Sequence, residues 1–142
     1  RDNGLSGPEY IFVSGMGPLH CQPRKGNIHS LPEAEFKEQI ADYGGTPEEV
    51  FTNSHLKELF IPILRADFKA YDEYSYKERN NSAFESEIVV FAGRNDELAV
   101  QLEEWQRYSK RKIDIYQFTG GHFFFQQETN KDKIIRIINE KL

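Results

Sequence analysis

The apolar residues of this chain follow two different spacings, and the first of them marks strands. Residues 88–92 form a short unbroken apolar run, rich in β-branched side chains and bounded by Gly93. Such a run is typical of a strand buried on both faces of a parallel sheet. Residues 10–14 form a second such run before a turn, and residues 113–118 are the next strand, before two glycines. We therefore predict about three mostly parallel strands.

The second spacing is helical and flanks these strands. Between residues 97 and 110, apolar side chains recur at i, i+4, i+7 and i+10, a stripe that would cover one sheet face: Leu98, Leu102, Trp105 and Tyr108. A last helix is expected to be capped by Thr129 or Asn130 and to bury the isoleucines and leucine between 134 and 142. Strands alternating with helices indicate an α/β fold.

The apolar pattern of residues 30–76 is helical throughout. Ser30 stands three residues before a glutamate, the spacing of a capping box, and Thr46 followed by Pro47 predicts a second helix start. Pro62 is expected to break or kink the helix that follows. An insertion of this length is longer than a crossover requires. It would be either a lid over the carboxyl edge of the sheet or a helical subdomain that only completes the core.

Composition and charge narrow the class of protein. The 142 residues are 38% hydrophobic, which is enough for the core of one domain or of part of one. A net charge of −5 with interspersed signs argues against non-specific nucleic-acid binding. Neither an apolar run of membrane-spanning length nor a signal peptide is visible, and the single Cys21 excludes an internal disulfide. We therefore expect a cytoplasmic protein that binds neither nucleic acid nor membrane.

Two groups of residues have side chains suitable for a metal site or for a nucleophile, but their spacing does not fit either role. His20, Cys21 and His29 carry metal-ligating side chains, yet they lack paired zinc-site spacing and a fourth ligand. We expect loop residues near a cleft, and no metal or other cofactor. Ser14 lacks the glycine two residues earlier that a nucleophile elbow requires, and Ser6 precedes a strand instead of following one. Neither serine is expected to be a nucleophile.

An acid and a histidine follow consecutive predicted strands. Asp96 comes just after the strand at 88–92, and His122 follows the strand at 113–118. Open α/β sheets build their sites at the carboxyl ends of strands, so both side chains are expected at one edge. The spacing is that of the last two members of a Ser-Asp-His triad. Alternatively, Asp96 caps a helix and His122 is a turn residue packed beside phenylalanines, and spacing alone leaves both interpretations open.

A set of short motifs is more specific than any spacing. These motifs are Phe12-Val13-Ser14-Gly15, Leu31-Pro32-Glu33-Ala34-Glu35-Phe36, Tyr43-Gly44-Gly45-Thr46-Pro47, Pro62-Ile63-Leu64-Arg65-Ala66-Asp67-Phe68, Trp105 and Gly120-Gly121-His122-Phe123-Phe124. With them, almost the whole chain resembles the C-terminal part of type II thioesterases. These are stand-alone α/β hydrolases that accompany non-ribosomal peptide and polyketide synthetases, and the thioesterases associated with fatty-acid synthases are their relatives.

The resemblance implies a serine hydrolase that cleaves acyl groups from the phosphopantetheine arms of acyl or peptidyl carrier proteins, clearing mis-primed or stalled arms. Asp96 matches the triad acid of the family, His122 matches its triad histidine, and about residues 30–76 match its lid. Residues 1–142 would be the C-terminal part of one α/β-hydrolase domain. Arg65 and Asp67 have no expected catalytic role, and we expect them to form a structural salt link within the lid.

One departure from the family is large. The family's serine lies in a Gly-x-Ser-x-Gly elbow upstream of the strand at 10–14, and that segment is absent from this sequence. Without the nucleophile and the oxyanion-hole donors, residues 1–142 alone are expected to be inactive. A sheet of three strands would expose apolar faces and an edge, so we expect the missing N-terminal half or another copy as a partner.

Two other classes of function stay open at this point. One is a non-catalytic module that docks carrier proteins through the lid and the basic helix end formed by Arg107, Lys110, Arg111 and Lys112. The other is an esterase of small free esters. The family motifs favour the thioesterase over both.

Overall fold

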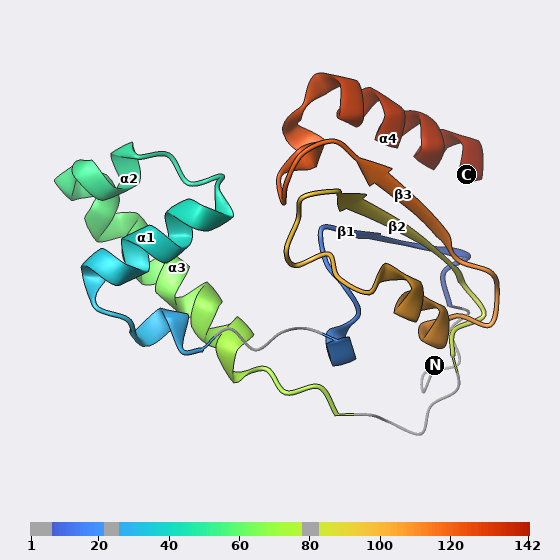
Figure 1. The fold of residues 1–142 in the computed structure, drawn as a ribbon, viewed down its shortest axis with the longest axis horizontal. Coiled ribbons are helices and arrows are strands. Elements are labelled where there is room, and N and C mark those ends of the chain that lie inside the picture. Colours follow the sequence, from blue (N-terminus) through green and yellow to red (C-terminus); the bar gives the residue numbers. More distant parts are fainter. Residues whose placement is uncertain (1–6, 22–25, 78–82) are drawn as a thin grey trace. The chain divides into compact units, whose positions relative to one another are not determined.

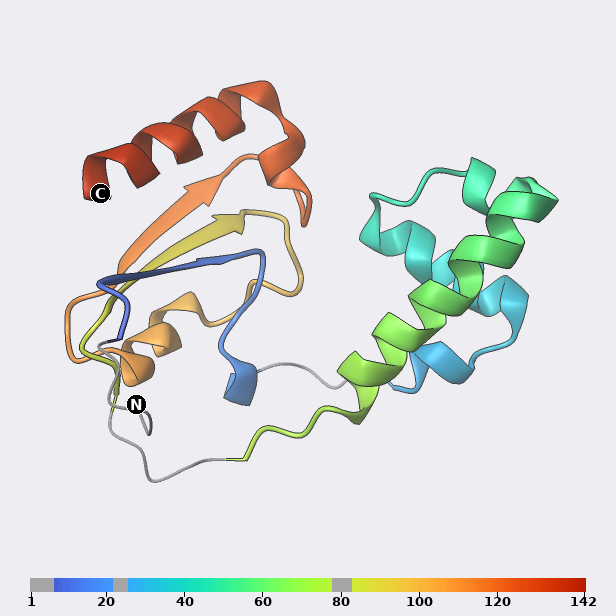
Figure 2. The same cartoon turned by 180° about the vertical axis from the view of Figure 1, so that it is seen from behind.

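The computed structural model describes residues 7–21, 26–77 and 83–142, which belong to two compact units. One is built around a sheet and comprises residues 1–22 and 78–142. We call it the sheet unit. The other comprises residues 23–77 and is helical, so we call it the helical unit. Figure 1 shows the fold and Figure 2 shows it from behind.

The sheet unit contains a parallel sheet of three strands in the order β1-β2-β3: β1 (Tyr10–Ser14), β2 (Glu87–Gly93) and β3 (Asp114–Phe118). Tyr10 pairs with Glu87 and Val89 pairs with Asp114, so the strands end at one edge. The central strand is buried from Ile88 to Gly93, as its unbroken apolar run predicts. The predicted strands and their parallel pairing are confirmed.

The side chains of β2 alternate between two faces, and a different helix covers each face. Ile88, Val90 and Ala92 form a core with Leu102 of the 3₁₀ helix η3 (Leu102–Tyr108). Val89 and Phe91 pack on the other face, against isoleucines of α4 (Glu128–Lys141). Figure 2 shows η3 and α4 on opposite sides of the sheet.

The helix expected at 97–110 is shorter and tighter than its apolar stripe predicts. Residues 97–99 form a turn and a bend, and only residues 102–108 are helical, as the 3₁₀ helix η3. Gln101 separates the two parts because its backbone is left-handed, with φ 48° and ψ 46°. The stripe nevertheless covers the sheet face as expected, since Leu102, Trp105 and Tyr108 pack in the same core.

The start of α4 differs from the expected cap. The helix begins at Glu128, and Asn130 lies inside its first turn, buried with 3% of its surface exposed. The Asn130 amide donates hydrogen bonds to the carbonyls of Thr119 and Phe124, both at 2.9 Å. The prediction of a cap at Thr129 or Asn130 is therefore wrong, because Asn130 satisfies acceptors of the preceding loop instead of N–H groups of the helix.

The helical unit consists of a 3₁₀ turn and three α-helices: η2 (Ile28–Ser30), α1 (Glu33–Tyr43), α2 (Glu49–Thr52) and α3 (Ser54–Glu73). Its core contains Ile28, Phe36 and Ile40, against which Leu64 and Phe68 of α3 pack. The predicted helical character of this region is confirmed. No helix within the described residues combines the length and apolar character needed to cross a membrane.

Both predicted helix caps in this unit are wrong. Ser30 donates its hydroxyl to the carbonyl of Asn27 at 2.9 Å, and Pro32 occupies the cap position of α1. Helix α2 begins after Glu48 and not after Thr46. The side chain that does cap a helix is Asn53, which accepts from the first N–H groups of α3 at 3.0 and 3.3 Å.

Of the break or kink predicted at Pro62, the break does not occur. Helix α3 runs from Ser54 to Glu73 with Pro62 inside it. Ile61 and Leu64, on either side of the proline, pack against the same core. This packing stabilises the helix on both sides of Pro62, although a proline in a helix interior costs about 3 kcal/mol in isolation.

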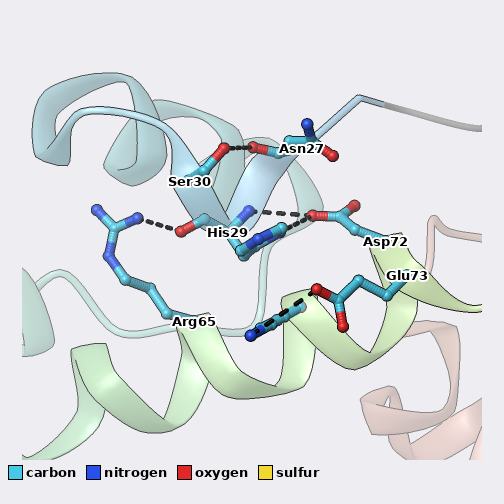
Figure 3. A network of polar contacts seen from close by, with 7 residues as sticks. Asn27, His29, Ser30, Arg65, Asp72 and Glu73 are labelled. Carbon is cyan, nitrogen blue, oxygen red and sulfur yellow. Dashed lines mark hydrogen bonds and ion pairs between the residues drawn. The ribbon is translucent and has the colours of Figure 1, made fainter.

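A polar network joins η2 to α3 (Figure 3). Oδ2 of Asp72 accepts from the backbone N–H of His29 at 3.1 Å and lies 2.8 Å from its imidazole Nδ1. Arg65 donates to the carbonyl of His29 at 2.5 Å and lies over the ring of Phe36, 4.2 Å from its centroid. Helix α3 therefore holds His29 by its N–H, its carbonyl and its ring.

This network corrects the expectation for Arg65 and Asp67. Within the described ranges they form no ion pair, and Asp67 is exposed. A separation of two positions places side chains on different sides of a helix, so the two do not face each other. Arg65 instead stabilises the turn at His29.

We expect Asp72→Ala to destabilise the helical unit by about 1–3 kcal/mol, because it leaves the partly buried N–H of His29 without its acceptor and removes the contact to the His29 ring. Asp67→Ala, on the same helix, is the matched control and should change stability by less than about 0.5 kcal/mol. Amide hydrogen exchange of α1 and α3 would measure both effects. Equal loss of protection in the two variants would contradict the role assigned to Asp72.

One ammonium group ties the end of α4 to the starts of two strands. Lys141 donates to Asp114 of β3 at 2.6 Å and also to Glu87 of β2. The hydrogen bond to Asp114, followed by that to Glu87, raises the pKa of Lys141 above its ordinary value. The same lysine thus fixes α4 along the sheet.

We expect Lys141→Met to lower the free energy of unfolding by about 1–2 kcal/mol at neutral pH. Because folding raises the pKa of Lys141, this difference should persist up to about pH 10.4 and shrink above it. Urea unfolding from pH 7 to 11.5 would test this. Lys131→Met, which removes an exposed pair with Glu128, should cost less than about 0.5 kcal/mol. If the difference in free energy of unfolding between the wild type and Lys141→Met stayed constant to pH 11.5, the charge of the Lys141 ammonium would not be its cause.

Candidate active site

Asp96 is fixed at the carboxyl end of β2 by the turn that contains it. Its N–H donates to the carbonyl of Gly93 at 3.2 Å, and its Oδ1 accepts from the N–H of Leu98 at 3.0 Å. Only 1% of its side chain is exposed. Its second oxygen, Oδ2, lies 3.0 Å from Nδ1 of His122. The sequence therefore predicts this pair correctly as neighbours at one edge of the sheet.

His122 reaches Asp96 from the loop after β3. Gly120 has φ +113°, a conformation that residues with a side chain rarely adopt, so the double glycine permits the tight turn. The loop is held by the Asn130 bond to Thr119 and by a bond from Asn95 N–H to the Gly120 carbonyl at 3.0 Å. The imidazole is 30% exposed. The ring is therefore held at Nδ1 by Asp96, while part of its surface stays accessible.

Gly93 allows the ends of β2 and β3 to approach this closely. A Cβ at Gly93 would overlap the carbonyl oxygen of Gly121 and lie 2.7 Å from that of Gly120. Any side chain here would push the His122 loop away from Asp96. In the sequence Gly93 marks only the boundary of a strand, because its neighbours from the loop after β3 become visible only in the fold.

Gly15 brings the end of β1 to the same pair. It has φ +65°, and a Cβ there would lie 3.2 Å from Cε1 of His122 and 3.7 Å from Oδ2 of Asp96. The signal in the sequence was the glycine-rich turn after residues 10–14, which predicts a carboxyl end but not its neighbours. All three strands therefore end around one histidine and one carboxylate.

The geometry suits general base and general acid chemistry. An ionised carboxylate only accepts hydrogen bonds, so an ionised Asp96 would receive the Nδ1–H of His122, and in the neutral imidazole Nε2 then carries the free lone pair. A ring oriented in this way takes a proton at Nε2 and returns it later, while the buried acid stabilises the imidazolium. The alternative, in which His122 is only a turn residue packed beside phenylalanines, describes its edge-on contact with Phe123 but not its bond to a buried acid.

In the described part of the chain, no serine or cysteine side chain is hydrogen-bonded to His122. Ser14 is exposed at the end of β1, and Ser6 lies outside the described residues. Burial, and next to it the charge of Glu104, raise the pKa of the Cys21 thiol, while Arg107 lowers it. A raised pKa keeps this thiol protonated and a poor nucleophile at neutral pH.

The two histidines with metal-ligating side chains, His20 and His29, form hydrogen bonds to other side chains. Nδ1 of His20 lies 2.7 Å from the hydroxyl of Tyr108, and His29 is held by Asp72. Among the residues that the structure describes, no group of three or more His, Cys, Asp or Glu side chains is placed to hold a metal ion.

His29 and Asp72 form a second histidine–carboxylate pair, which has no signal in the sequence because the two residues are 43 positions apart. It differs from the first in its backbone contacts: Asp72 also accepts from the N–H of His29, and Arg65 holds the carbonyl of His29. These bonds fix a turn onto a helix. His122 has neither bond, and it lies where strands end, so we take His122 and Asp96 as the candidate site.

We expect Gly93→Ala to disturb this site and to cost about 1–3 kcal/mol of stability, because the added methyl group overlaps backbone of the His122 loop. Loss of the low-field Nδ1–H signal of His122 in a proton NMR spectrum would report the broken bond. Gly7→Ala is the control, since a Cβ at Gly7 has nothing within 4 Å. Retention of the signal and of stability in Gly93→Ala would contradict the close approach.

A parallel sheet covered on both faces, with an acid and a histidine at its carboxyl edge, is characteristic of the α/β hydrolases. The comparison with protein families narrows this class. The family model for the thioesterase domain matches residues 2–142, so the chain belongs to the thioesterase family.

Relatives with assigned roles agree with this family. The gramicidin S biosynthesis protein GrsT of Aneurinibacillus migulanus is 34% identical over 129 residues, which are 89% of this chain and 50% of GrsT. The medium-chain S-acyl fatty acid synthase thioesterase of Rattus norvegicus is 27% identical over 129 residues, 89% of this chain and 49% of that protein. The chain thus spans about half the length of these curated relatives.

Solved structures agree as well. ClbQ from the colibactin NRPS/PKS pathway superimposes with a TM-score of 0.83 at 30% identity, covering 98% of this chain and 58% of ClbQ. The type II thioesterase BorB from the borrelidin biosynthetic cluster has a TM-score of 0.78 at 26% identity, covering 98% of this chain and 56% of BorB. The resemblance to type II thioesterases and the α/β fold are both confirmed.

Proposed function

We propose that this chain supplies the acid and the base of a serine thioesterase that releases acyl groups from the phosphopantetheine arms of carrier proteins. The observation that carries the proposal is the 3.0 Å contact between Nδ1 of His122 and Oδ2 of the buried Asp96, in a chain of the thioesterase family. Asp96 and His122 are accordingly the proposed catalytic residues.

The reaction proceeds in two steps that His122 connects. Its Nε2 takes the proton of a serine hydroxyl as the serine oxygen attacks the thioester carbonyl, and the proton then passes to the departing thiolate. In the second step Nε2 takes a proton from water, whose oxygen attacks the acyl-serine ester, and returns it to the serine. Asp96 orients the ring and stabilises the imidazolium in both steps.

The serine itself is proposed to come from outside the described residues. His122 has no serine partner within the described part of the chain, and family members use a serine in an elbow after a strand. We accordingly expect residues 1–142, expressed alone, to show no thioester turnover. A polypeptide that adds the nucleophile-bearing segment should restore it.

Carrier-bound thioesters are the proposed substrates because of the relatives. GrsT is a gramicidin S biosynthesis protein, and ClbQ belongs to a pathway of non-ribosomal peptide and polyketide synthesis. Such pathways hold their intermediates as thioesters on carrier proteins. An acyl or peptidyl carrier protein is therefore the proposed partner, and editing or regeneration of the synthetase the proposed role.

The helical unit is proposed to act as a lid over the acyl group. It is inserted between β1 and β2, and its helix α3 exposes large apolar side chains. The exposed fractions are 59% for Leu59, 40% for Phe60 and 49% for Ile63. Contact with an acyl chain would remove these apolar side chains from water, which is favourable.

In the complete protein, His122→Ala should reduce turnover of a carrier-bound acyl thioester at least about 10⁴-fold, because no group remains to take the serine proton. Asp96→Asn should cost about 10³–10⁴-fold, since it disturbs the tautomer that accepts this proton. Trapping of the acyl-enzyme by mass spectrometry would locate the lost step. Turnover at the wild-type rate in His122→Ala would remove this histidine from the mechanism.

The same assay separates the two other candidate functions. A carrier-bound thioester, the same acyl group on free pantetheine and a simple ester of that acid should be compared at equal concentration. A preference for the carrier-bound thioester supports the proposal, and a preference for the simple ester indicates an esterase. Binding of the carrier without turnover by the complete protein would indicate a non-catalytic module.

A further inference from the structure

A pocket of about 340 Å³ lies between β3 and α4, within the sheet unit. Six of the side chains that line it come from the turn after β2, from β3 and its following loop, and from α4: Arg94, Tyr116, Thr119, Lys133, Arg136 and Ile137. Neither Asp96 nor His122 lines it. The pocket is therefore separate from the proposed catalytic pair.

Three cations and no carboxylate line this pocket. The cations are Arg94, Lys133 and Arg136, and none of them has an ion-pair or side-chain hydrogen-bond partner among the described residues. Asp132 and Glu140 lie one helical turn from Arg136, yet they do not pair with it and do not line the pocket. The charge on the pocket wall is thus uncompensated by the protein.

Elsewhere in the described chain most lysines are paired, although Lys77 and Lys112 form no ion pair. Six of them pair with carboxylates: Lys37, Lys57, Lys69, Lys110, Lys131 and Lys141. In a chain with a net charge of −5, carboxylates outnumber cations, so pairing is the usual outcome. Three cations left unpaired around one cavity therefore indicate a place for an external anion.

We propose that this pocket binds an organic phosphate that carries at least two negative charges. The guanidinium groups of Arg94 and Arg136 present planar forks that match phosphate oxygens, and Lys133 adds a point charge. A single carboxylate would leave two of the three cations uncompensated. Tyr116 and Ile137 provide apolar surface for the organic part of such a ligand.

Two sources could present this chemistry. One is a free nucleotide-like coenzyme with a diphosphate and a phosphate monoester, such as coenzyme A. The other is the phosphate of a phosphopantetheine arm on a carrier protein together with a neighbouring acidic group. Only the second source rests on the proposed function, so binding of the first tests the pocket independently of catalysis.

The experiment is isothermal titration of the complete protein with coenzyme A, and with pantetheine as the ligand that lacks phosphate. We expect coenzyme A to bind and pantetheine to bind at least tenfold more weakly. Lys133→Gln and Arg136→Gln should each raise the Kd for coenzyme A at least fivefold. Lys131→Gln is the matched control on the same helix, because it removes one charge that does not line the pocket, and should change the Kd less than twofold.

Two further measurements assign the source and separate this proposal from the catalytic one. The His122→Ala variant should bind coenzyme A as the wild type does, even though it lacks turnover. A rise in KM for a carrier-bound thioester in Arg136→Gln, with kcat unchanged, would assign the pocket to the arm. An unchanged KM together with weakened coenzyme A binding would assign it to the free coenzyme.

Several results would overturn the proposal. These are equal binding of pantetheine and coenzyme A, an equal effect of Lys131→Gln, or a Kd for coenzyme A that neither pocket variant changes. Binding of inorganic sulfate as tightly as coenzyme A would equally reject a ligand with an organic part.

Discussion

The site depends on the close approach of two backbone segments, at Gly93 and at Gly120-Gly121. The carbonyls after β3 occupy the space that a side chain on Gly93 would need. Only with this space empty does the loop after β3 come near enough for Nδ1 of His122 to lie 3.0 Å from Asp96. The catalytic proposal thus rests on a backbone contact as much as on the two side chains that would act.

Parallel strands make such an approach systematic. In a parallel sheet the strands run in one direction, so their carboxyl ends and the loops that follow them gather at one edge. Here β1, β2 and β3 contribute Gly15, Asp96 and His122 to that edge. The order β1-β2-β3 places the acid's strand between the other two, and so the acid is buried while the histidine stays partly exposed.

The sequence predicts the features that depend on short segments. The apolar run at 88–92 identifies the central strand, and the positions of Asp96 and His122 after consecutive strands place both side chains at one edge of the sheet, since both signals are local. The helix caps fail for a physical reason. Ser30 has an alternative acceptor in Asn27, and Asn130 finds loop carbonyls, so both side chains bond to groups that the sequence does not show. The continuity of α3 through Pro62 likewise depends on packing at Ile61 and Leu64.

Features that join distant segments were not visible in the sequence. Gly93 and Gly121 are 28 residues apart. The residues that hold His29, Arg65 and Asp72, are 36 and 43 positions away from it. The pocket beside β3 is of the same kind. Lys133 and Arg136 occupy one side of an ordinary amphipathic helix, and their lack of partners becomes apparent only when the fold brings Arg94 beside them.

Helix α4 combines several of these constraints in fourteen residues. Its isoleucines cover one sheet face, Asn130 holds the loop that carries His122, and Lys141 pins its far end to two strands. Both ends of the helix are fixed, so the helix backbone between them is held beside β3. Lys133 and Arg136 therefore lie at fixed positions along this strand. Folding has thus already ordered the backbone that carries these two cations, and ligand binding needs to order only their exposed side chains. The residues that stabilise the helix and those proposed to bind phosphate therefore act together, although they contact different groups.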